Sequence, residues 1–104
     1  MKISKSAISG TLESCDVMIQ VEPRQSGLEI EINSIVLNRF GKHILEVVKE
    51  TLRHLQVERA CVRIDDRGAL DCTIRARLQS ALYRASEEEG EIPWEAMIWP
   101  DAID

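Results

Sequence analysis

Two adjacent side chains near the start of the chain, Ser14 and Cys15, are the best candidates for nucleophilic chemistry. They lie in residues 10–16, with the sequence GTLESCD, between the carboxylates of Glu13 and Asp16. A catalytic thiol needs a neighbouring base, and no histidine lies within 25 residues of Cys15 in the sequence. On its own the segment fits an ordinary turn serine beside a small half-buried cysteine, or a cysteine-dependent enzyme without an evident base.

The remaining residues of catalytic type form no recognisable site. His43 and His54 are eleven residues apart on one predicted helix, which separates them by roughly three turns. They are expected to be surface or boundary histidines. Cys15, Cys61 and Cys72 are an odd number of cysteines without CxxC spacing, so neither a disulfide framework nor a zinc site is predicted. The chain contains no glycine-rich phosphate loop, HExxH or GxSxG motif.

The composition predicts one globular domain over residues 1–104. Hydrophobic residues make up 44% and charged residues 30%, and only 4% are aromatic, so the core must be aliphatic. No apolar run approaches the roughly 20 residues that span a bilayer. The start, MKISKSAISG, lacks the continuous apolar stretch of a secretory signal. We expect a cytoplasmic protein with no membrane partner.

The acidic charge is concentrated at the end of the chain. Residues 87–104 contain seven acids and no base, whereas residues 1–86 contain 13 bases and 11 acids. Because these bases alternate with acids and form no concentrated basic stretch, a nucleic-acid partner is not expected. The acidic tail, residues 87–104, either aids solubility or serves as a docking surface.

The elements that position Ser14 can be predicted from periodicity. Residues 1–13 show no sustained period and are expected to form a flexible, extended arm. Apolar residues alternate with polar ones over residues 17–22 and again over residues 28–33. The intervening residues 23–27 contain proline and glycine, which predicts a hairpin of two half-buried strands.

A helix of about 20 residues is predicted next, because apolar residues fall three or four apart between Val36 and Leu55. Ser34 is its expected N-cap. Alternation at Ala60, Val62 and Ile64 predicts a further strand, which the turn residues 65–68 end.

Residues 69–73 fit both strand and helix periods. A short extended entry followed by a helix from about Asp71 or Thr73 to Ala85 is favoured, because the segment RARLQSALYRA is rich in good helix formers.

These elements predict an α+β fold in the order β-β-α-β-α. It consists of an antiparallel or mixed sheet of three to four strands with two helices packed on one face. The residues in phase with each element form the predicted core: Val17, Ile19, Leu28, Ile30, Ile32, Phe40, Ile44, Val48, Leu52, Val62, Ile64, Ile74, Leu78 and Leu82.

Four short segments resemble the acyl carrier (gamma) subunit of citrate lyase. They are GTLES followed by DVMI at residues 10–19, INS at residues 32–34, DDRGALDC at residues 65–72 and RARL at residues 75–78. The GTLES and DDRGALDC segments together are specific, and the resemblance extends from Met1 to about Ala85. Cys15 departs from the small residue, such as glycine, expected there.

The resemblance implies that Ser14 carries a prosthetic group, 2'-(5''-triphosphoribosyl)-3'-dephospho-CoA, attached covalently through a phosphodiester. The thiol of this arm would hold acetyl or citryl groups during the cleavage of citrate to acetate and oxaloacetate. The implied partners are the alpha (acyltransferase) and beta (lyase) subunits and a prosthetic-group transferase. The chain itself would be a non-catalytic carrier with no metal.

Two alternatives stay open at this point. The carrier subunit of malonate decarboxylase uses the same kind of arm, so the substrate could be malonate, although the GTLES segment favours citrate. The chain could also be a cofactor-free protein interaction module that docks through an exposed sheet face or through its acidic tail.

Overall fold

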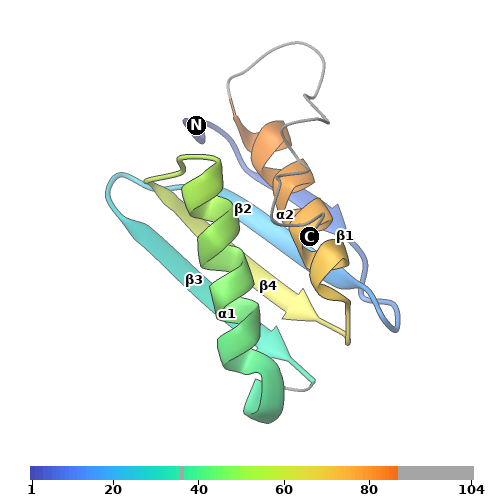
Figure 1. The fold of residues 1–104 in the computed structure, drawn as a ribbon. Coiled ribbons are helices and arrows are strands. Elements are labelled where there is room, and N and C mark those ends of the chain that lie inside the picture. The colour runs from blue at the N-terminus through green and yellow to red at the C-terminus, as the bar shows by residue number, and fades with distance from the viewer. Residues whose placement is uncertain (36, 87–104) are drawn as a thin grey trace.

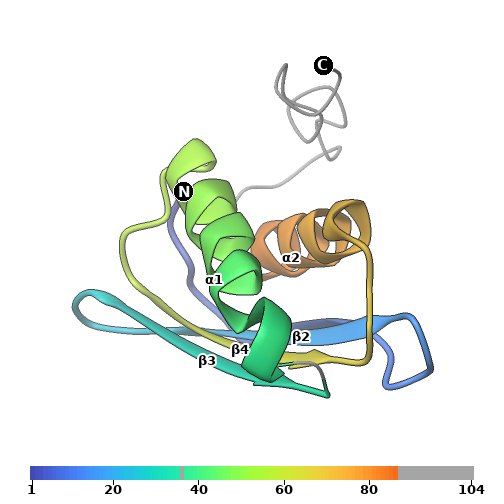
Figure 2. The same cartoon turned by 60° about the horizontal axis from the view of Figure 1, so that its bottom comes forward.

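The computed structural model describes residues 1–35 and 37–86. Within these ranges it describes all side chains except those of residues 37–41. The described elements are β1 (Ala7–Gly10), β2 (Val17–Pro23), β3 (Leu28–Ser34), α1 (Leu37–His54), β4 (Ala60–Asp66) and α2 (Asp71–Ala85). Both helices lie on the same face of one mixed sheet (Figures 1 and 2). The predicted α+β fold is confirmed, with β1 added to the predicted order. The acidic tail lies outside the described residues.

The sheet order is β1-β2-β4-β3, so the predicted hairpin between β2 and β3 is wrong. β4 lies between these strands, antiparallel to β2 and parallel to β3. Both Pro23 and Leu28 are in register with Ala60, and the amide N–H of Ala60 donates to the carbonyl of Gly27 at 3.2 Å. Residues 24–27 therefore connect β2 to β3 across the start of β4 and do not form a hairpin turn.

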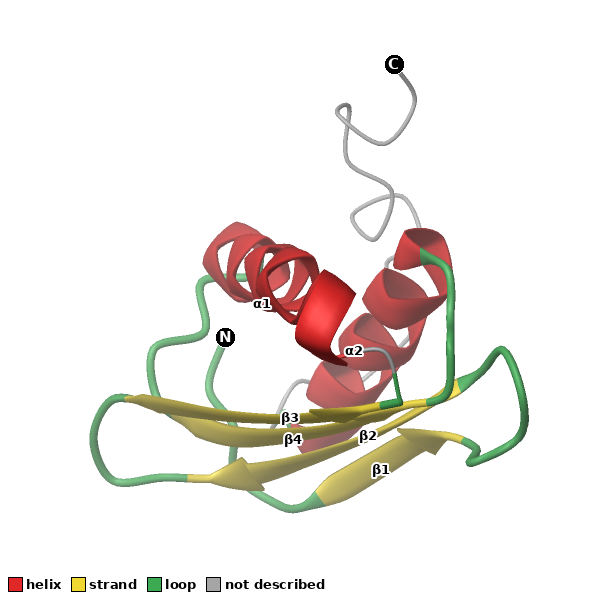
Figure 3. Cartoon of the chain, turned by 90° about the horizontal axis from the view of Figure 1, so that it is seen from below, coloured by secondary structure: helices red, strands yellow, loops and turns green. Residues whose placement is uncertain are grey.

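The connection between β3 and β4 explains this order. Parallel neighbours need a crossover of a dozen or more residues, usually a helix, and α1 supplies it. The crossover places β4 beside β3, and β4 then presents its second edge to β2. Both edges of β4 are thus paired, while β1 and β3 form the edges of the sheet (Figure 3).

The core lies between the sheet and the two helices, and it is aliphatic as predicted. Ten of the predicted core residues are 0–3% exposed: Val17, Ile19, Ile44, Val48, Leu52, Val62, Ile64, Ile74, Leu78 and Leu82. The predictions for β3 hold less well, because Leu28 is 41% exposed and Ile30 and Ile32 are only half-buried. An edge strand at the margin of the helical layer cannot bury its apolar face as fully as a central one. The side chain of Phe40 lies outside the described residues.

The predicted flexible arm over residues 1–13 needs correction. Residues 7–10 form β1, which pairs antiparallel with β2. Ile3 is buried and forms a bridge with Ser86, just after α2. The backbone N–H of Ser4 donates to the carbonyl of Ala85 at 2.9 Å. The arm is extended as expected, but long-range backbone pairing orders it, and periodicity does not report such pairing.

The two helices begin and end near the predicted positions. α2 runs from Asp71 to Ala85, which settles residues 71–73 as helix. The predicted N-cap of α1 is wrong, since Ser34 is the last residue of β3 and its hydroxyl donates to the carboxylate of Asp66 at 2.8 Å. Within the described residues, neither helix has the length and apolarity to cross a membrane.

Candidate functional site

Ser14 lies in the loop between β1 and β2, and Gly10 is the residue that allows this loop to form. Gly10 has a φ of +90°, a conformation that residues with a side chain rarely adopt. A Cβ atom at this position would lie 1.8 Å from the carbonyl oxygen of Val17. The glycine that opens the GTLES segment is therefore required both by its backbone angle and by the close approach of β2.

Ser14 occupies the second position of a tight turn over residues 13–16. The backbone N–H of Asp16 donates to the carbonyl of Glu13 at 3.1 Å, which closes the turn. Cys15 follows with a φ of 65°, at the position where such turns favour glycine. This geometry is the physical reason to expect a small residue at position 15. Ser14 is exposed, and Cys15 Sγ lies 3.8 Å from its hydroxyl oxygen.

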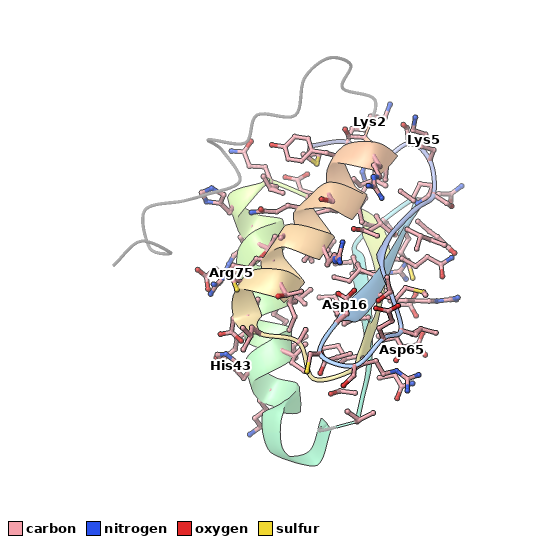
Figure 4. All side chains as sticks on the ribbon, turned by 90° about the vertical axis from the view of Figure 1, so that its right-hand side faces the viewer. Lys2, Lys5, Asp16, His43, Asp65 and Arg75 are labelled. Carbon is pink, nitrogen blue, oxygen red and sulfur yellow. The ribbon has the colours of Figure 1, made fainter. Side chains whose placement is uncertain are left out.

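The carboxylate of Asp16 holds the loop together at its base. Thr11 Oγ1 donates to it at 2.6 Å, and the backbone N–H of Val17 donates to it at 2.7 Å. Arg77 of α2 adds Nε and Nη2 as donors, at 3.2 and 3.1 Å. Together these contacts fix the Ser14 loop to the side of the sheet next to α2 (Figure 4).

The same contacts lower the pKa of Asp16 from its ordinary value of 3.8 to about 2. The hydrogen bond from Thr11 is the main cause, followed by the bond from the Val17 N–H. The guanidinium of Arg77 contributes further, while desolvation acts in the opposite direction. A bond that favours the charged form stabilises the fold only while the group is charged.

Asp16 should therefore make stability depend on acidity in a defined range. Its contribution is expected to be complete above about pH 4 and to be lost as the pH falls to about 2, the folded-state pKa. Urea unfolding of wild type and Asp16→Asn between pH 6 and pH 2 measures this. The advantage of wild type should shrink below pH 4. A difference that stays constant down to pH 2 would contradict the assignment.

The backbone after β4 supports the other side of the Ser14 loop. The N–H of Cys15 donates to the carbonyl of Arg67 at 2.8 Å, and the N–H of Arg67 donates to the carbonyl of Asp16 at 2.9 Å. This reciprocal pair extends the β2–β4 ladder into the loop. The turn is thus held by main chain on one side and by α2 on the other, while the Ser14 side chain faces solvent.

Asp66, which is 1% exposed, organises the connection from β4 to α2. Its carboxylate accepts from the hydroxyl of Ser34 at 2.8 Å and from the backbone N–H of Ala69 at 2.9 Å. Its carbonyl accepts from the N–H of Ile35 at 3.3 Å. One buried residue thus links the end of β3 to the loop that supports Ser14.

These bonds connect the segments that carried the resemblance, which are residues 10–19, 32–34, 65–72 and 75–78. The sequence pattern alone indicated no role for Asp66 or Arg77. Asp16 and Arg77 are 61 residues apart, a separation at which no local pattern signals a contact.

The histidines and the other cysteines belong to α1, β4 and α2 and not to the Ser14 loop. His43 Nε2 lies 2.6 Å from a carboxylate oxygen of Asp71, on the helices, and His54 is the last residue of α1. All three cysteines are free, with Cys15 and Cys72 exposed. Across residues 1–35 and 37–86, no three His, Cys, Asp or Glu side chains are grouped to hold a metal. The site offers an exposed, well-positioned hydroxyl, which suits covalent attachment.

Comparisons with known proteins identify the family and the relatives of this chain. The family model ACP, described as malonate decarboxylase delta subunit (MdcD), matches residues 4–85. The citrate lyase acyl carrier protein 2 of Salmonella typhimurium is 52% identical over 98 residues, covering 93% of this chain and 100% of that protein. The citrate lyase acyl carrier protein of Cronobacter sakazakii is 53% identical over 97 residues, covering 93% and 99%.

Among solved structures, a Pseudomonas malonate decarboxylase hetero-tetramer in complex with malonate contains a chain of the same fold. The TM-score is 0.70 at 21% identity, and the match covers 83% of this chain and 93% of that one. The curated relatives are carriers, not catalytic subunits, so the cysteine-dependent enzyme is excluded. The chain belongs to the acyl carrier family that includes the citrate lyase acyl carrier proteins, as the resemblance predicted.

Proposed function

We propose that the chain is the carrier subunit of a cytoplasmic citrate lyase, and that Ser14 carries the phosphoribosyl dephospho-CoA arm that is transferred from 2'-(5''-triphosphoribosyl)-3'-dephospho-CoA. The observation that carries this proposal is the exposed Ser14 side chain at the corner of a turn that is held from both sides. An arm that visits other subunits needs an attachment point that is accessible and firmly anchored to the fold.

The attachment chemistry balances with Ser14 as the acceptor. The hydroxyl oxygen loses its proton and bonds to the phosphorus next to the ribose, and pyrophosphate leaves from the triphosphate, so one phosphate remains as a phosphodiester. The bound arm supplies a thiol that holds acetyl or citryl as a thioester. Cys15 Sγ lies 3.8 Å from the Ser14 hydroxyl, and the described residues contain no group of three His, Cys, Asp or Glu side chains that could hold a metal ion. We assign activation of the Ser14 hydroxyl to the transferase. The alpha subunit would exchange the acyl group, and the beta subunit would then cleave the citryl thioester.

Residues of this chain hold the loop and leave the hydroxyl accessible. The Asp16–Arg77 pair and the main-chain bonds to Arg67 fix the turn, while Ser14 itself is exposed. The exposed Glu13 adds a negative charge beside the acceptor, which basic groups of a transferase could meet.

The carrier subunit of malonate decarboxylase is the second candidate, favoured by the family description and by the structural neighbour. Citrate is preferred because the citrate lyase carriers match this chain at 52–53% identity over nearly its whole length, whereas the malonate decarboxylase chain matches at 21%.

Reconstitution tests the proposal. The chain is coexpressed with the transferase and the enzyme that makes its precursor, and intact mass is expected to show one adduct. The loaded carrier, assembled with the alpha and beta subunits, should cleave citrate to acetate and oxaloacetate, whereas the chain alone should not. The absence of an adduct would contradict both candidates. An adduct whose acyl group turns over only with malonate decarboxylase subunits would favour the second.

A further inference from the structure

Four basic side chains from separate segments line one recess of about 780 Å³, which we call the basic recess. They are Lys2 of the N-terminal segment, Arg24 of the β2–β3 link, Arg53 at the end of α1 and Arg59 before β4. These segments lie at one end of the fold and the β1–β2 loop lies at the other (Figure 1). Figure 4 likewise places Lys2 away from Asp16, which anchors the Ser14 loop.

The positive charge of the basic recess is neutralised only weakly by the described residues. Arg24 Nε lies 3.9 Å from the carboxylate of Glu29, and both side chains are exposed. Arg53 and Arg59 form no ion pair within residues 1–35 and 37–86. A basic residue in the last turn of a helix is favourable, which explains Arg53 but not the cations from three other segments. Because gathered like charges repel, the recess suits an anionic occupant.

The acidic tail begins at the wall of the basic recess. Ser86, the last described residue before the tail, forms a bridge with Ile3, which lines the recess. The backbone N–H of Ser4 donates to the carbonyl of Ala85 at 2.9 Å. These contacts between the two ends of the described chain fix the point at which the tail leaves the fold.

The first residues of the tail have the charge that the basic recess requires. Residues 86–91 have the sequence SEEEGE, so four glutamates follow Ser86 within five residues. Five extended residues span up to about 17 Å, which is enough to cross a recess of this volume. A single exposed ion pair contributes little. The tether to Ser86, however, keeps the glutamates at a high effective concentration beside the recess.

We propose that residues 87–91 of the acidic tail bind in the basic recess of the same chain. Charge complementarity and the position of Ser86 favour this occupant over a separate acidic protein, because the tail already begins beside the recess. A tail held there lies away from the Ser14 loop. It therefore adds no negative charge beside Glu13 and leaves the Ser14 hydroxyl accessible.

The chain contains its own probe for the position of the tail. Its two tryptophans, Trp94 and Trp99, both belong to the acidic tail, so tryptophan fluorescence of the full chain reports on the tail alone. Acrylamide is an uncharged quencher, so charge substitutions do not alter its approach. Quenching of wild type should rise about twofold in about 1 M NaCl, because the Debye length there falls to about 3 Å and exposed ion pairs are screened.

Two double variants with the same net charge test the basic recess. The recess variant, Arg53→Gln with Arg59→Gln, should show at low salt the stronger quenching that wild type shows at high salt. The control, Lys42→Gln with Arg63→Gln, changes exposed residues of α1 and β4 outside the recess. This control should be quenched like wild type. Thermal unfolding checks that both variants are folded.

Charge reversal separates a contact between recess and tail from an effect on the fold. Arg53→Glu with Arg59→Glu reverses the recess, and Glu88→Lys with Glu89→Lys reverses the tail. Each reversal alone should raise the quenching, because it brings like charges together. The four substitutions combined should restore the quenching of wild type, since opposite charges face each other again. A combined variant that is quenched like either reversal alone would overturn the proposal.

Three further results would also overturn it. Equal quenching of the recess variant and the control would show that the recess does not hold the tail. A wild-type dimer in analytical ultracentrifugation that dissociates in the recess variant would assign the tail to the recess of a second copy. A recess variant with wild-type quenching but weaker binding to the lyase subunits would assign the recess to a partner protein. None of these measurements requires the arm on Ser14, so their outcome is independent of the proposed function.

Discussion

Ser14→Ala should acquire no prosthetic group when it is coexpressed with the transferase and the precursor-making enzyme. The reason is chemical, because the phosphodiester requires the Ser14 oxygen. The loss should be complete and not a fractional decrease. The variant should remain folded, since an exposed serine changes the free energy of unfolding by only about 0.5 kcal/mol when truncated. Intact mass for the adduct and thermal unfolding for the fold measure the two effects separately.

Cys15→Ala is the matched control, because Cys15 Sγ is the other nucleophile at this turn and lies 3.8 Å from the Ser14 oxygen. Alanine retains the Cβ atom, so the strain of the positive φ at position 15 is unchanged. This variant should be modified like wild type. A phosphodiester to a hydroxyl is stable to thiols, whereas a link at a cysteine would be compromised by the reactive thiol that ends the arm. An adduct on Ser14→Ala that disappears in Cys15→Ala would move the site to the thiol.

Gly10→Ala should destabilise the protein by more than about 3 kcal/mol and abolish loading of Ser14. Two costs combine at this position. The positive φ of Gly10 costs a residue with a side chain about 1–2 kcal/mol. The new Cβ would in addition lie 1.8 Å from the carbonyl oxygen of Val17, so β1 and β2 would have to separate where the Ser14 loop begins. Urea unfolding and intact mass after coexpression measure the two effects.

Gly68→Ala separates the two costs. Gly68 has nearly the same backbone angle, a φ of +89°, but no heavy atom lies within 4 Å of where its Cβ would be. Gly68→Ala should therefore lower the free energy of unfolding only by the cost of the positive φ, about 1–2 kcal/mol. Its Ser14 should still be loaded. Equal decreases in the free energy of unfolding of the two variants would show that the contact with Val17 is relieved at little cost.

Local sequence patterns predict most of the elements and the candidate attachment residue. An element with one apolar face shows it in its own residues. Apolar residues alternate over residues 17–22 and 60–64, and they have helical spacing over residues 44–52. The structure confirms the strands and helices they predict. Ser14 was identified through its segment and is exposed, as an attachment residue must be. Its modification stays a prediction.

The pairing of the strands depends on contacts between segments that are distant in the sequence. Alternation identifies a half-buried strand but not its neighbour, so the short link between β2 and β3 suggested a hairpin. The helical crossover of α1 instead placed β4 between them. The same strand order leaves β3 at an edge of the sheet. Leu28 of β3 is therefore 41% exposed, whereas Val17, which has a similar sequence pattern, is fully buried. β1 likewise depends on pairing with β2, which no periodicity in residues 1–13 reveals.

The support of the Ser14 loop was also decided in three dimensions. Arg77 reaches Asp16 across 61 residues, and Ser34 bonds to Asp66 across 32. Each of these side chains is ordinary in its own segment: Ser34 resembles a helix cap, and Arg77 resembles one of many charges on a helix. A hydrogen bond requires two groups to meet at a distance and angle that only the packed sheet and helices set. The candidate attachment residue could therefore be proposed from the chain, whereas the contacts that hold it in place could not.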